Sequence, residues 1–456
     1  MRWLASAVAT AVDGTLSGPD AEVDGAAIDS RRIRGGELFV PVPAARDGHA
    51  FVTDALAAGA AAYLTARPPE CGGTAVAVAD TVAALTTLGR AARDRLPDRV
   101  VGVTGSSGKT STKDLLAAAL DGPFHPAASE RSHNNELGVP LTLLNTPEGT
   151  DLTIVELGAR GPGHIRFLCD IARPTVGVVT NVGLAHTEML GDLEGVARAK
   201  SELVQSLPPW GTAVLNAEDT RVAAMRSLSA AAVLSFGVDD GDVRAADLSL
   251  DAELRPSFRL CSPWGEVDVR LSVRGAHHAA NAAAAAAAAL AVGAPLGDIA
   301  AGLARARLSP WRMELSRSAT GGLVLNDAYN ANPASTEAAL RSLAALDARR
   351  RVAILGPMLE LGEHDAPEHR RIGELARSLG IDQLVTVGAP GYGAHDVPDI
   401  EAAAAAVEPV GPGDAVLVKA SRAAGFERLA ERLLLGPRPK SPAPPQSHAA
   451  AGVVVW

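Results

Sequence analysis

The stretch VVGVTGSSGKTSTKDLL, residues 100–116, places an apolar run, a loop of glycine and serine, and a helix-forming run in succession. Strand, loop and helix in that order form a phosphate-binding loop. Glycines let backbone N–H groups curl around phosphate oxygens, and the helix N-terminus adds the positive end of its dipole. Lys109 supplies a positive charge, and the Thr110 hydroxyl can bind magnesium. The stretch therefore predicts a site for a magnesium-bound nucleotide.

This loop is a short variant of the usual pattern. Its first glycine is Gly105, whereas the usual spacing places a glycine where this chain has Val103. A glycine-rich turn without a ligand is the alternative interpretation, but the flanking strand and helix favour the phosphate site. We expect the nucleotide to contact Thr104, Gly105, Ser106, Ser107, Gly108, Lys109, Thr110 and Ser111.

Strand-like and helical runs alternate after the start of this stretch. From Arg99 to about Leu308 the apolar runs are RVVGVTG, LTIVELGA, TVGVVTNVG and GTAVLNAED. Helical segments follow most of them, which predicts a mainly parallel sheet covered by helices. From Ser309 the alternation repeats with GLVLNDAY, RRVAILG, DQLVTVG and DAVLVKAS. This second series predicts a smaller doubly wound sheet.

The segments at the two ends differ from this pattern. Short strand-like runs at 37–42, 61–64 and 74–78 precede Pro97, and MRWLASAVATAVDG favours an opening helix. The last segment, GPRPKSPAPPQSHAAAGVVVW, is rich in Pro, Ser and Ala and predicts a disordered tail. We therefore expect an α/β protein of three domains and a tail, divided as 1–97, 98–308, 309–437 and 438–456.

Composition narrows the class of protein. The 456 residues are 47% hydrophobic and 21% charged, which is typical of a globular chain. A formal net charge of −10 argues against a nucleic-acid partner, because such binding needs a basic face. Cys71, Cys169 and Cys261 form no paired motif, which fits a reducing cytoplasm. The alanine-rich run 282–292 is too short to span a bilayer and favours a packed helix, so we expect no membrane insertion.

Further candidate residues follow the predicted strands. Glu156 in IVELGA and His186 in TNVGLAH are at predicted strand ends, both at the carboxyl edge where open α/β sheets bind ligands. Either side chain could bind a metal, although a solvated glutamate and a structural histidine are the ordinary alternatives. Lys200 lies in a helical run and by pattern alone is a surface lysine. The turns SHNNELG (132–138) and DAYNANP (327–333) are loops by composition.

Nine segments resemble, in order, those of the Mur ligases: TGSSGKTSTK, SHNNELGVPLTLLN, VELGA, NVGLAH, the helix with Lys200, GAHHAAN, DAYNANPAS, MLELGE and VLVKASR. The resemblance spans about 28–435. The segments YNANP, MLELGE and DSRRIRGGELFVPVPAARDGHAF are closest to the members that join D-alanyl-D-alanine to UDP-N-acetylmuramoyl-tripeptide. It implies an N-terminal UDP-binding domain, a central ATPase domain, and a C-terminal Rossmann-like domain that closes over the nucleotide.

The resemblance also implies a reaction and its cofactors. The terminal carboxylate of the UDP-linked tripeptide would attack the γ-phosphate of ATP, and the amine of D-alanyl-D-alanine would capture the resulting acyl phosphate. Mg²⁺ is the expected metal, and Lys200 matches a lysine that these ligases carbamylate. We expect a monomer that binds these small molecules.

Roles are implied for individual residues by their match to the family's motifs. Lys109 would hold the β- and γ-phosphates, while Thr110, Glu156, His186 and carbamylated Lys200 would bind metal, and Lys109, Lys200, His186 and Glu156 form the catalytic set. Further ATP contacts would be Asn281, Arg312, Asp327 and Tyr329. Substrate contacts would be Ser30, Arg31, Asp47, Gly48, His49, Asn134, Asn135, Asn330, Asn332, Lys419, Ser421 and Arg422.

Several positions depart from the family pattern. His278 replaces a common Asn, Pro357 replaces Asp, Ala420 replaces Gly, and Ala44-Ala45 lack the usual Gly. Pro357 and Ala420 lie where the acceptor should bind, so a ligase with a different amine acceptor is the main alternative. No DNPR-type motif is present, and DSRRIRGGELF has no counterpart in folylpolyglutamate synthase. A phosphate-loop protein without ligase activity is the alternative from another class.

Overall fold

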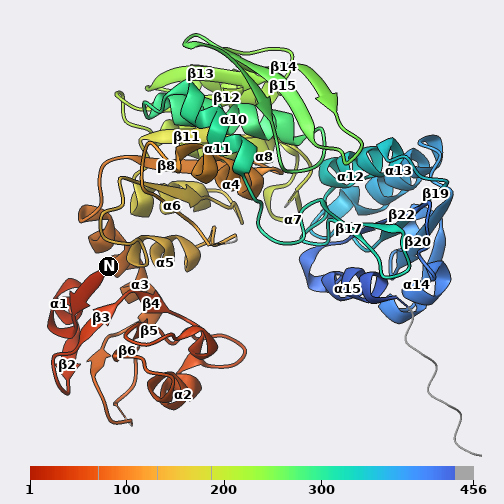
Figure 1. Ribbon diagram of the computed structural model, residues 1–456. Helices are drawn as coiled ribbons and strands as arrows, with labels where there is room; N and C mark the ends of the chain where they lie inside the picture. Colours follow the sequence, from red (N-terminus) through yellow and green to blue (C-terminus); the bar gives the residue numbers. More distant parts are fainter. Residues whose placement is uncertain (70, 131, 186, 437–456) are drawn as a thin grey trace, which may run out of the picture.

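A computed structural model describes residues 1–69, 71–130, 132–185 and 187–436. Figure 1 shows three groups of elements, which we call the N-terminal unit (2–94), the central unit (100–305) and the C-terminal unit (314–435). The N-terminal unit lies below the central unit in this view, and the C-terminal unit lies beside it. The predicted tail at 438–456 lies outside the described residues, as does His186.

Two small sheets build the N-terminal unit. The larger has the order β2-β7-β6-β5-β4, with bounds Thr15–Ser17, Ala75–Ala77, Ala62–Thr65, Leu38–Phe39 and Ala26–Ala27. The predicted strands at 37–42, 61–64 and 74–78 are present, but the first is shorter than expected. Helices α2 and α3 complete the unit, at Val52–Ala57 and Thr81–Asp94.

The prediction of an opening helix from residue 1 is partly wrong. Arg2–Leu4 forms strand β1, which pairs antiparallel with β3, Glu22–Asp24. The N-terminal ammonium group also pairs with Asp24 over 3.1 Å. Helix α1 therefore begins only at Ala5 and ends at Ala11. A long-range strand pairing outweighs the local helical preference here.

The central unit holds a nine-stranded sheet in the order β16-β15-β14-β13-β12-β11-β8-β10-β9. Strands β8 to β14 run parallel to their neighbours, and the pairs β14-β15 and β15-β16 are antiparallel. The mainly parallel sheet predicted from the four apolar runs is confirmed. Its bounds are Val100–Thr104 (β8), Pro126–Ala128 (β9), Leu152–Glu156 (β10), Val176–Val179 (β11), Thr212–Asn216 (β12), Ala232–Gly237 (β13), Val243–Leu250 (β14), Pro256–Ser262 (β15) and Gly265–Arg270 (β16).

Helices cover both faces of this sheet. Helices α4 (Lys109–Leu120), α10 (His278–Ala291) and α11 (Leu296–Arg305) share one apolar core, and α5 (Gly138–Leu144), α6 (His164–Ala172) and α8 (Leu193–Gln205) share the other. The alanines from 282 to 289 are fully buried, so α10 is the packed helix expected there. Among the described residues, no helix has the length and apolarity needed to cross a bilayer.

The C-terminal unit is a six-stranded sheet in the order β17-β18-β22-β19-β20-β21. Only β17 runs antiparallel to its neighbour, so the predicted second parallel sheet is confirmed. The strands are Glu314–Arg317, Leu323–Asn326, Asp414–Lys419, Arg350–Leu355, Gln383–Val387 and His395–Val397 in that order. The helices are α12 (Pro333–Ala345), α13 (Asp365–Ser378), α14 (Ile400–Val407) and α15 (Glu427–Leu435).

Candidate functional site

The phosphate loop connects β8 to α4 at the carboxyl edge of the central sheet. Gly105 has a φ of +151°, and a Cβ built there would lie 1.8 Å from Thr180 Oγ1. Gly108 precedes α4 with a φ of +79°, in the left-handed region. Only glycine meets both demands without strain. The loop is also tied to the segment just after the neighbouring strand β11, since Ser107 N donates to Asn181 Oδ1 over 2.9 Å.

Lys109 begins helix α4 and folds back over the loop. Its ammonium group donates to the carbonyl of Gly105 over 2.7 Å. Burial lowers the pKa of Lys109 from its usual value, whereas the nearby Glu156 carboxylate opposes that change. A phosphate anion placed against this loop would stabilise the charged form of the lysine.

Glu156 ends strand β10, which lies beside β8 in the sheet, so its carboxylate reaches the phosphate loop. Its Oε2 accepts from the Thr110 hydroxyl over 2.7 Å, and its Oε1 accepts from Asn134 Nδ2 over 2.8 Å. Thr110 and Glu156 are both buried. A carboxylate and a hydroxyl are oxygen ligands of the kind that Mg²⁺ prefers. The residues present therefore fit a magnesium ion.

Lys200 is not the exposed lysine that pattern alone suggested. It lies on α8 with 1% of its surface exposed, and no carboxylate in the described ranges pairs with it. Burial lowers the pKa of Lys200 well below its usual value, and the nearby Lys109 lowers it further. Its environment therefore favours a neutral amine. His186, the other predicted metal ligand, lies outside the described residues.

The C-terminal unit contributes residues that lie close to this loop. The Arg312 guanidinium lies 4.1 Å from the ring centroid of Tyr329, whose hydroxyl is bonded to Ser132 Oγ of the central unit. Asn332 Nδ2 donates to the carbonyl of Ser106 over 3.3 Å. The charge of Arg312 also lowers the pKa of Lys109. Arg312 therefore lies within electrostatic range of the phosphate loop.

Asp327 and Lys419 form a second group in the C-terminal unit. Lys419 Nζ bonds to Asp327 Oδ2 and donates to the carbonyl of Asn330 over 2.9 Å. Both charges reach His277 of the central unit, where burial chiefly lowers the histidine pKa to about 4. The turn at 327–333 therefore faces the start of α10 across the junction of the two units.

Helix α10 carries two polar side chains, those of His278 and Asn281, toward the same junction. Asn281 Oδ1 accepts from Thr112 Oγ1 over 3.4 Å, and Asn281 lies so close to Gly108 that a Cβ there would be 2.5 Å from Oδ1. His278, which occupies the position of a family Asn, contacts Asn281 through Nδ1 over 3.1 Å. Asn281 thus lies against the phosphate loop, as expected of a nucleotide contact.

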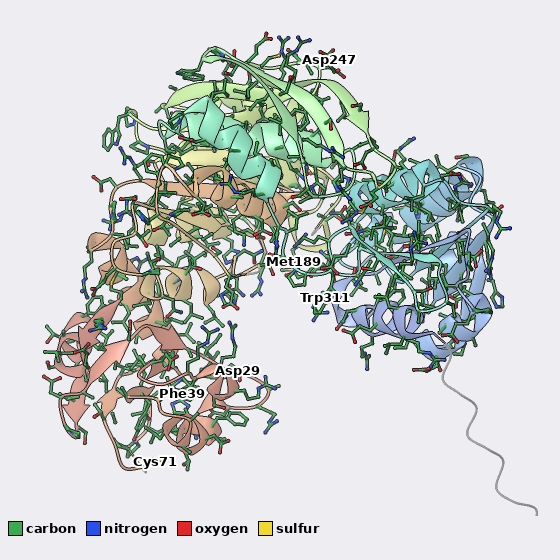
Figure 2. The ribbon with its side chains drawn as sticks, viewed as in Figure 1. Asp29, Phe39, Cys71, Met189, Asp247 and Trp311 are labelled. Atoms are coloured by element: carbon green, nitrogen blue, oxygen red, sulfur yellow. The ribbon has the colours of Figure 1, made fainter. Side chains whose placement is uncertain are left out.

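The predicted substrate residues of the N-terminal unit lie apart from the phosphate loop. Asp29 caps the turn at Ser30 and Arg31 and accepts from Arg31 Nε over 2.9 Å. Asp47 caps the turn at Gly48 and His49 and accepts from His49 N over 3.0 Å. Figure 2 shows Asp29 and Phe39 in the N-terminal unit, well separated from Trp311 and Met189 near the C-terminal unit.

A cleft of about 650 Å³ runs between the N-terminal and central units. Its walls include strands β4 and β9 and the side chains of Arg32, Glu130 and His133. Arg32 pairs with Glu130 across the cleft. Asn145 Nδ2 donates to the carbonyl of Ala26 over 2.9 Å, and Asn145 Oδ1 accepts from the N–H of Ala26 over 2.8 Å. These contacts between distant segments have no signal in the sequence.

The remaining predicted substrate residues have separate surroundings. Asn135 does not bind Glu156 as Asn134 does, because its Oδ1 accepts from Gly138 N over 2.8 Å at the start of α5. Ser421 Oγ accepts from Leu359 N over 2.9 Å. Arg422 stacks on Trp311 at 4.5 Å and pairs with Glu427. Ser421 is therefore buried within the C-terminal unit, whereas Arg422 lies at its surface, beside the linker that carries Trp311.

Sequence reasoning missed three residues that support Glu156. Lys113 Nζ donates to the carbonyl of Ser129 over 2.5 Å, and Glu156 N donates to Ser129 Oγ over 3.2 Å. Asp114 pairs with Lys113 over 2.9 Å and accepts from Ser309 N over 2.7 Å. The only available signal was that Lys113 follows Lys109 by four residues, on the same face of the helix.

This fold and site define a class: a phosphate-loop protein whose loop contacts a second, mainly parallel α/β unit. The Mur ligase middle domain family matches residues 103–289, and the Mur ligase, glutamate ligase domain family matches residues 311–422. The UDP-N-acetylmuramoyl-tripeptide–D-alanyl-D-alanine ligase of Mycobacterium tuberculosis is 42% identical, over 89% of this chain and 91% of that relative.

Comparison with solved structures leads to the same family. The UDP-N-acetylmuramoylalanyl-D-glutamyl-2,6-diaminopimelate–D-alanyl-D-alanyl ligase of Acinetobacter baumannii has a TM-score of 0.83 and 31% identity, covering 95% of this chain and 98% of that one. MurF from Thermotoga maritima in complex with ADP has a TM-score of 0.78 and 29% identity, covering 90% and 97%. The chain belongs to the Mur ligases, in the family of UDP-N-acetylmuramoyl-tripeptide–D-alanyl-D-alanine ligases.

Proposed function

We propose that this protein uses ATP to join D-alanyl-D-alanine to UDP-N-acetylmuramoyl-tripeptide in peptidoglycan precursor synthesis. The main observation behind this proposal is the hydrogen bond of 2.7 Å that the Thr110 hydroxyl donates to the Glu156 carboxylate beside the phosphate loop. Homologous ligases of known name cover most of the chain. The ADP complex of the Thermotoga maritima relative supports ATP as the nucleotide. We propose the cytoplasm as the site of this reaction, because ATP and UDP-linked substrates are found there.

The reaction needs a carboxylate to become an electrophile. The tripeptide's terminal carboxylate oxygen attacks the γ-phosphorus of ATP, the bond to the β,γ-bridging oxygen breaks, and ADP leaves. The amine of D-alanyl-D-alanine then attacks the acyl carbon, releasing phosphate and a proton and forming the amide. Positioning and charge neutralisation carry most of the catalysis in such phosphoryl transfers. Lys109 supplies charge at the β- and γ-phosphates, and the loop N–H groups orient them.

Mg²⁺ and a modified lysine complete this proposal. Thr110 and Glu156 would hold a magnesium ion, which neutralises phosphate charge when bound. Lys200 would carry a carbamate, turning a buried amine into a metal-binding carboxylate, and His186 would bind a second ion. Support for the carbamate comes from the burial of Lys200 and its lowered pKa, since CO₂ reacts with a neutral amine.

The C-terminal unit would close over ATP and admit the acceptor. Arg312, Asp327 and Tyr329 lie at its junction with the central unit and would contact ATP, with Asn281 on the other side. Closure of this kind completes a catalytic site and excludes water. The remaining predicted substrate contacts would bind the two substrates other than ATP. Ser30, Arg31 and the turn at 47–49 would bind the UDP-linked substrate, and Asn330, Asn332, Lys419, Ser421 and Arg422 would lie near the acceptor.

A ligase with another amine acceptor is the second candidate, because two family positions differ in the C-terminal unit. The structure accommodates both differences within the unit. Ala420 packs closely against Gly356, since a Cβ built on Gly356 would lie 2.6 Å from the Cβ of Ala420. The residue after Pro357 is held by a hydrogen bond of 3.1 Å, which Met358 N donates to His369 Nε2. These contacts hold both positions within the C-terminal unit, and the names of the relatives support D-alanyl-D-alanine as the first acceptor to test.

The test is phosphate release with Mg-ATP and the UDP-linked tripeptide, with and without D-alanyl-D-alanine, while mass spectrometry follows the peptide. We expect release to depend on both substrates and the peptide to gain one dipeptide. Turnover that needs neither substrate would contradict ligase activity. Turnover restored only by another amine would support the second candidate.

A further inference from the structure

Three polar residues form a cluster on the loops that follow strands β9 and β10. Arg160 Nη1 donates to Glu136 Oε1 over 2.8 Å. His164 Nδ1 accepts from the backbone N–H of Arg160 over 3.1 Å, which leaves the proton on Nε2. That Nε2 lies 3.4 Å from Glu136 Oε2. The Glu136 carboxylate therefore lies between the Arg160 guanidinium and the His164 ring.

This cluster continues outward from the catalytic carboxylate. Asn134 binds Glu156 through its side-chain amide, and the backbone carbonyl of Asn134 accepts from Gly158 N over 2.7 Å, so the two loops run side by side. Glu136 lies two residues beyond Asn134 on one loop, and Arg160 lies four beyond Glu156 on the other. The carboxyl edge of the sheet, where substrates of such folds bind, thus carries Glu156 and, four residues further along the chain, Arg160.

The cluster of Glu136, Arg160 and His164 also lies on the side of the sheet toward the N-terminal unit. The cluster belongs to the loops of β9 and β10, and β9 is the edge strand that faces β4 across the cleft. A UDP-linked peptide bound at the N-terminal unit must bring its terminal carboxylate to Glu156. Its peptide portion would then pass the loops that carry Glu136 and Arg160.

Arg160 has the charge and the free donors to bind an anion. Its side chain is 61% exposed, and within the described ranges only Glu136 pairs with its guanidinium. A guanidinium has five N–H donors that match a carboxylate in a two-pronged geometry. An exposed ion pair contributes little to stability, so a purely structural role would leave this arginine with little effect. Glu136 and the backbone contact to His164 hold it in one place, which lowers the cost of ordering it on binding.

We propose that Arg160 binds a carboxylate of the substrate's peptide, other than the reacting one, and so selects the peptide. This inference rests on the proposed function. The name of the Acinetobacter baumannii relative contains a glutamyl and a 2,6-diaminopimelate residue. Such a peptide has two carboxylates besides the reacting one: one on the glutamyl residue and a second on diaminopimelate. Both offer the same chemistry to a guanidinium.

Binding and kinetics of Arg160→Met and Arg160→Lys test the inference. The control is Arg341→Met, because Arg341 is 58% exposed and pairs with Glu337 over 2.9 Å, much as Arg160 pairs with Glu136. We would measure the Kd of UDP-muramoyl-tripeptide by calorimetry without acceptor, and KM and kcat in the full reaction. For Arg160→Met we expect Kd and KM for the tripeptide to rise about tenfold, while kcat and the KM for ATP change less than twofold.

Two tripeptides distinguish the carboxylates, one ending in diaminopimelate and one ending in lysine, which lacks the second carboxylate. A loss confined to the diaminopimelate substrate assigns Arg160 to that residue, and an equal loss with both assigns it to the glutamyl carboxylate. Unchanged Kd and KM for both, or an equal loss in Arg341→Met, overturns the inference. A wild-type enzyme that binds the tripeptide but transfers no dipeptide would count against the proposed function alone, because the calorimetric comparison does not use the acceptor.

Discussion

The hydroxyl of Thr110 donates a hydrogen bond to Oε2 of Glu156 across 2.7 Å, although 46 positions separate the two residues in the chain. The bond exists because β8 and β10 are parallel neighbours whose carboxyl ends meet at one edge. It places a hydroxyl and a carboxylate side by side, next to the lysine of the phosphate loop. The proposed magnesium site depends on this pair.

Replacing Glu156 with glutamine should impair metal use while preserving the fold. The amide oxygen can still accept from Thr110, but the negative charge is lost. We expect ATP turnover to fall at least about a hundredfold and the Mg²⁺ concentration for half-maximal activity to rise. A magnesium titration of turnover measures this, with the exposed Glu266→Gln as control. An unchanged magnesium dependence would show that Glu156 does not bind the metal.

Lys109→Met should abolish turnover without preventing folding. The lysine is half-buried beside the loop, and methionine preserves most of its length without the charge. Removing a charge that stabilises the transferred phosphate costs several powers of ten in rate, and we expect about a thousandfold. Steady-state phosphate release measures the rate, and circular dichroism checks the fold. Turnover within tenfold of wild type would rule out the phosphate assignment.

Lys200→Ala should also abolish turnover, and a small carboxylic acid should restore part of it. The alanine leaves a space into which acetate or propionate can bring the carboxylate that a carbamate would supply. Because burial lowers the pKa of Lys200, we also expect CO₂-depleted wild-type enzyme to lose activity and bicarbonate to restore it. Activity assays with and without each addition measure these effects. Full activity of Lys200→Ala would exclude the carbamate.

The sequence predicted the parts of the fold in which local pattern and burial agree. Parallel strands buried on both faces are continuous apolar runs, so VVGVT and LTIVE were evident as neighbours of ligand-binding loops. The antiparallel strands β14 to β16 are exposed and polar at many positions and were not predicted. Residues 2–4 were predicted as helix because their strand partner lies some twenty residues away.

The site was predictable only where a short motif carries the chemistry. The loop residues 104–111 follow from their spacing, whereas the contact of Tyr329 with Ser132 spans 197 positions and depends on how two units meet. Lys113 and Asp114 resembled an ordinary charged helix surface. Their burial follows from the strand and the linker that cover α4, which the helical pattern does not encode.

Thr187→Val should weaken the junction between the central and C-terminal units. The buried Thr187 hydroxyl donates to the carbonyl of Leu361 over 2.9 Å, and valine keeps its shape but not the donor. An unsatisfied buried carbonyl costs about 1–3 kcal/mol in the arrangement seen in this structure, in which the two units meet. We therefore expect kcat to fall about tenfold and the radius of gyration with bound nucleotide to increase, as measured by X-ray scattering.

Thr146→Val is the matched control for this change. Thr146 is also buried and donates over 2.9 Å, but its partner is Thr142 within the central unit. This variant should lose stability without changing the radius of gyration. If both variants lower kcat equally and neither expands the protein, the junction does not depend on Thr187.

Stability should fall in mild acid through His277. Burial, assisted by the Lys419 charge and opposed by Asp327, lowers the pKa of His277 to about 4, against 6.5 as the usual value. Between these values the unfolded chain binds a proton that the folded chain does not, so the free energy of unfolding decreases as pH falls through this interval. One such proton corresponds to about 1.4 kcal/mol per pH unit. Urea unfolding of the wild type between pH 6 and 4.5 should therefore lose about that much more per unit than His277→Asn, whose side chain takes up no proton. Equal slopes in the two proteins would mean that His277 is protonated as readily in the folded chain as in the unfolded one, and hence that the junction leaves it open to water.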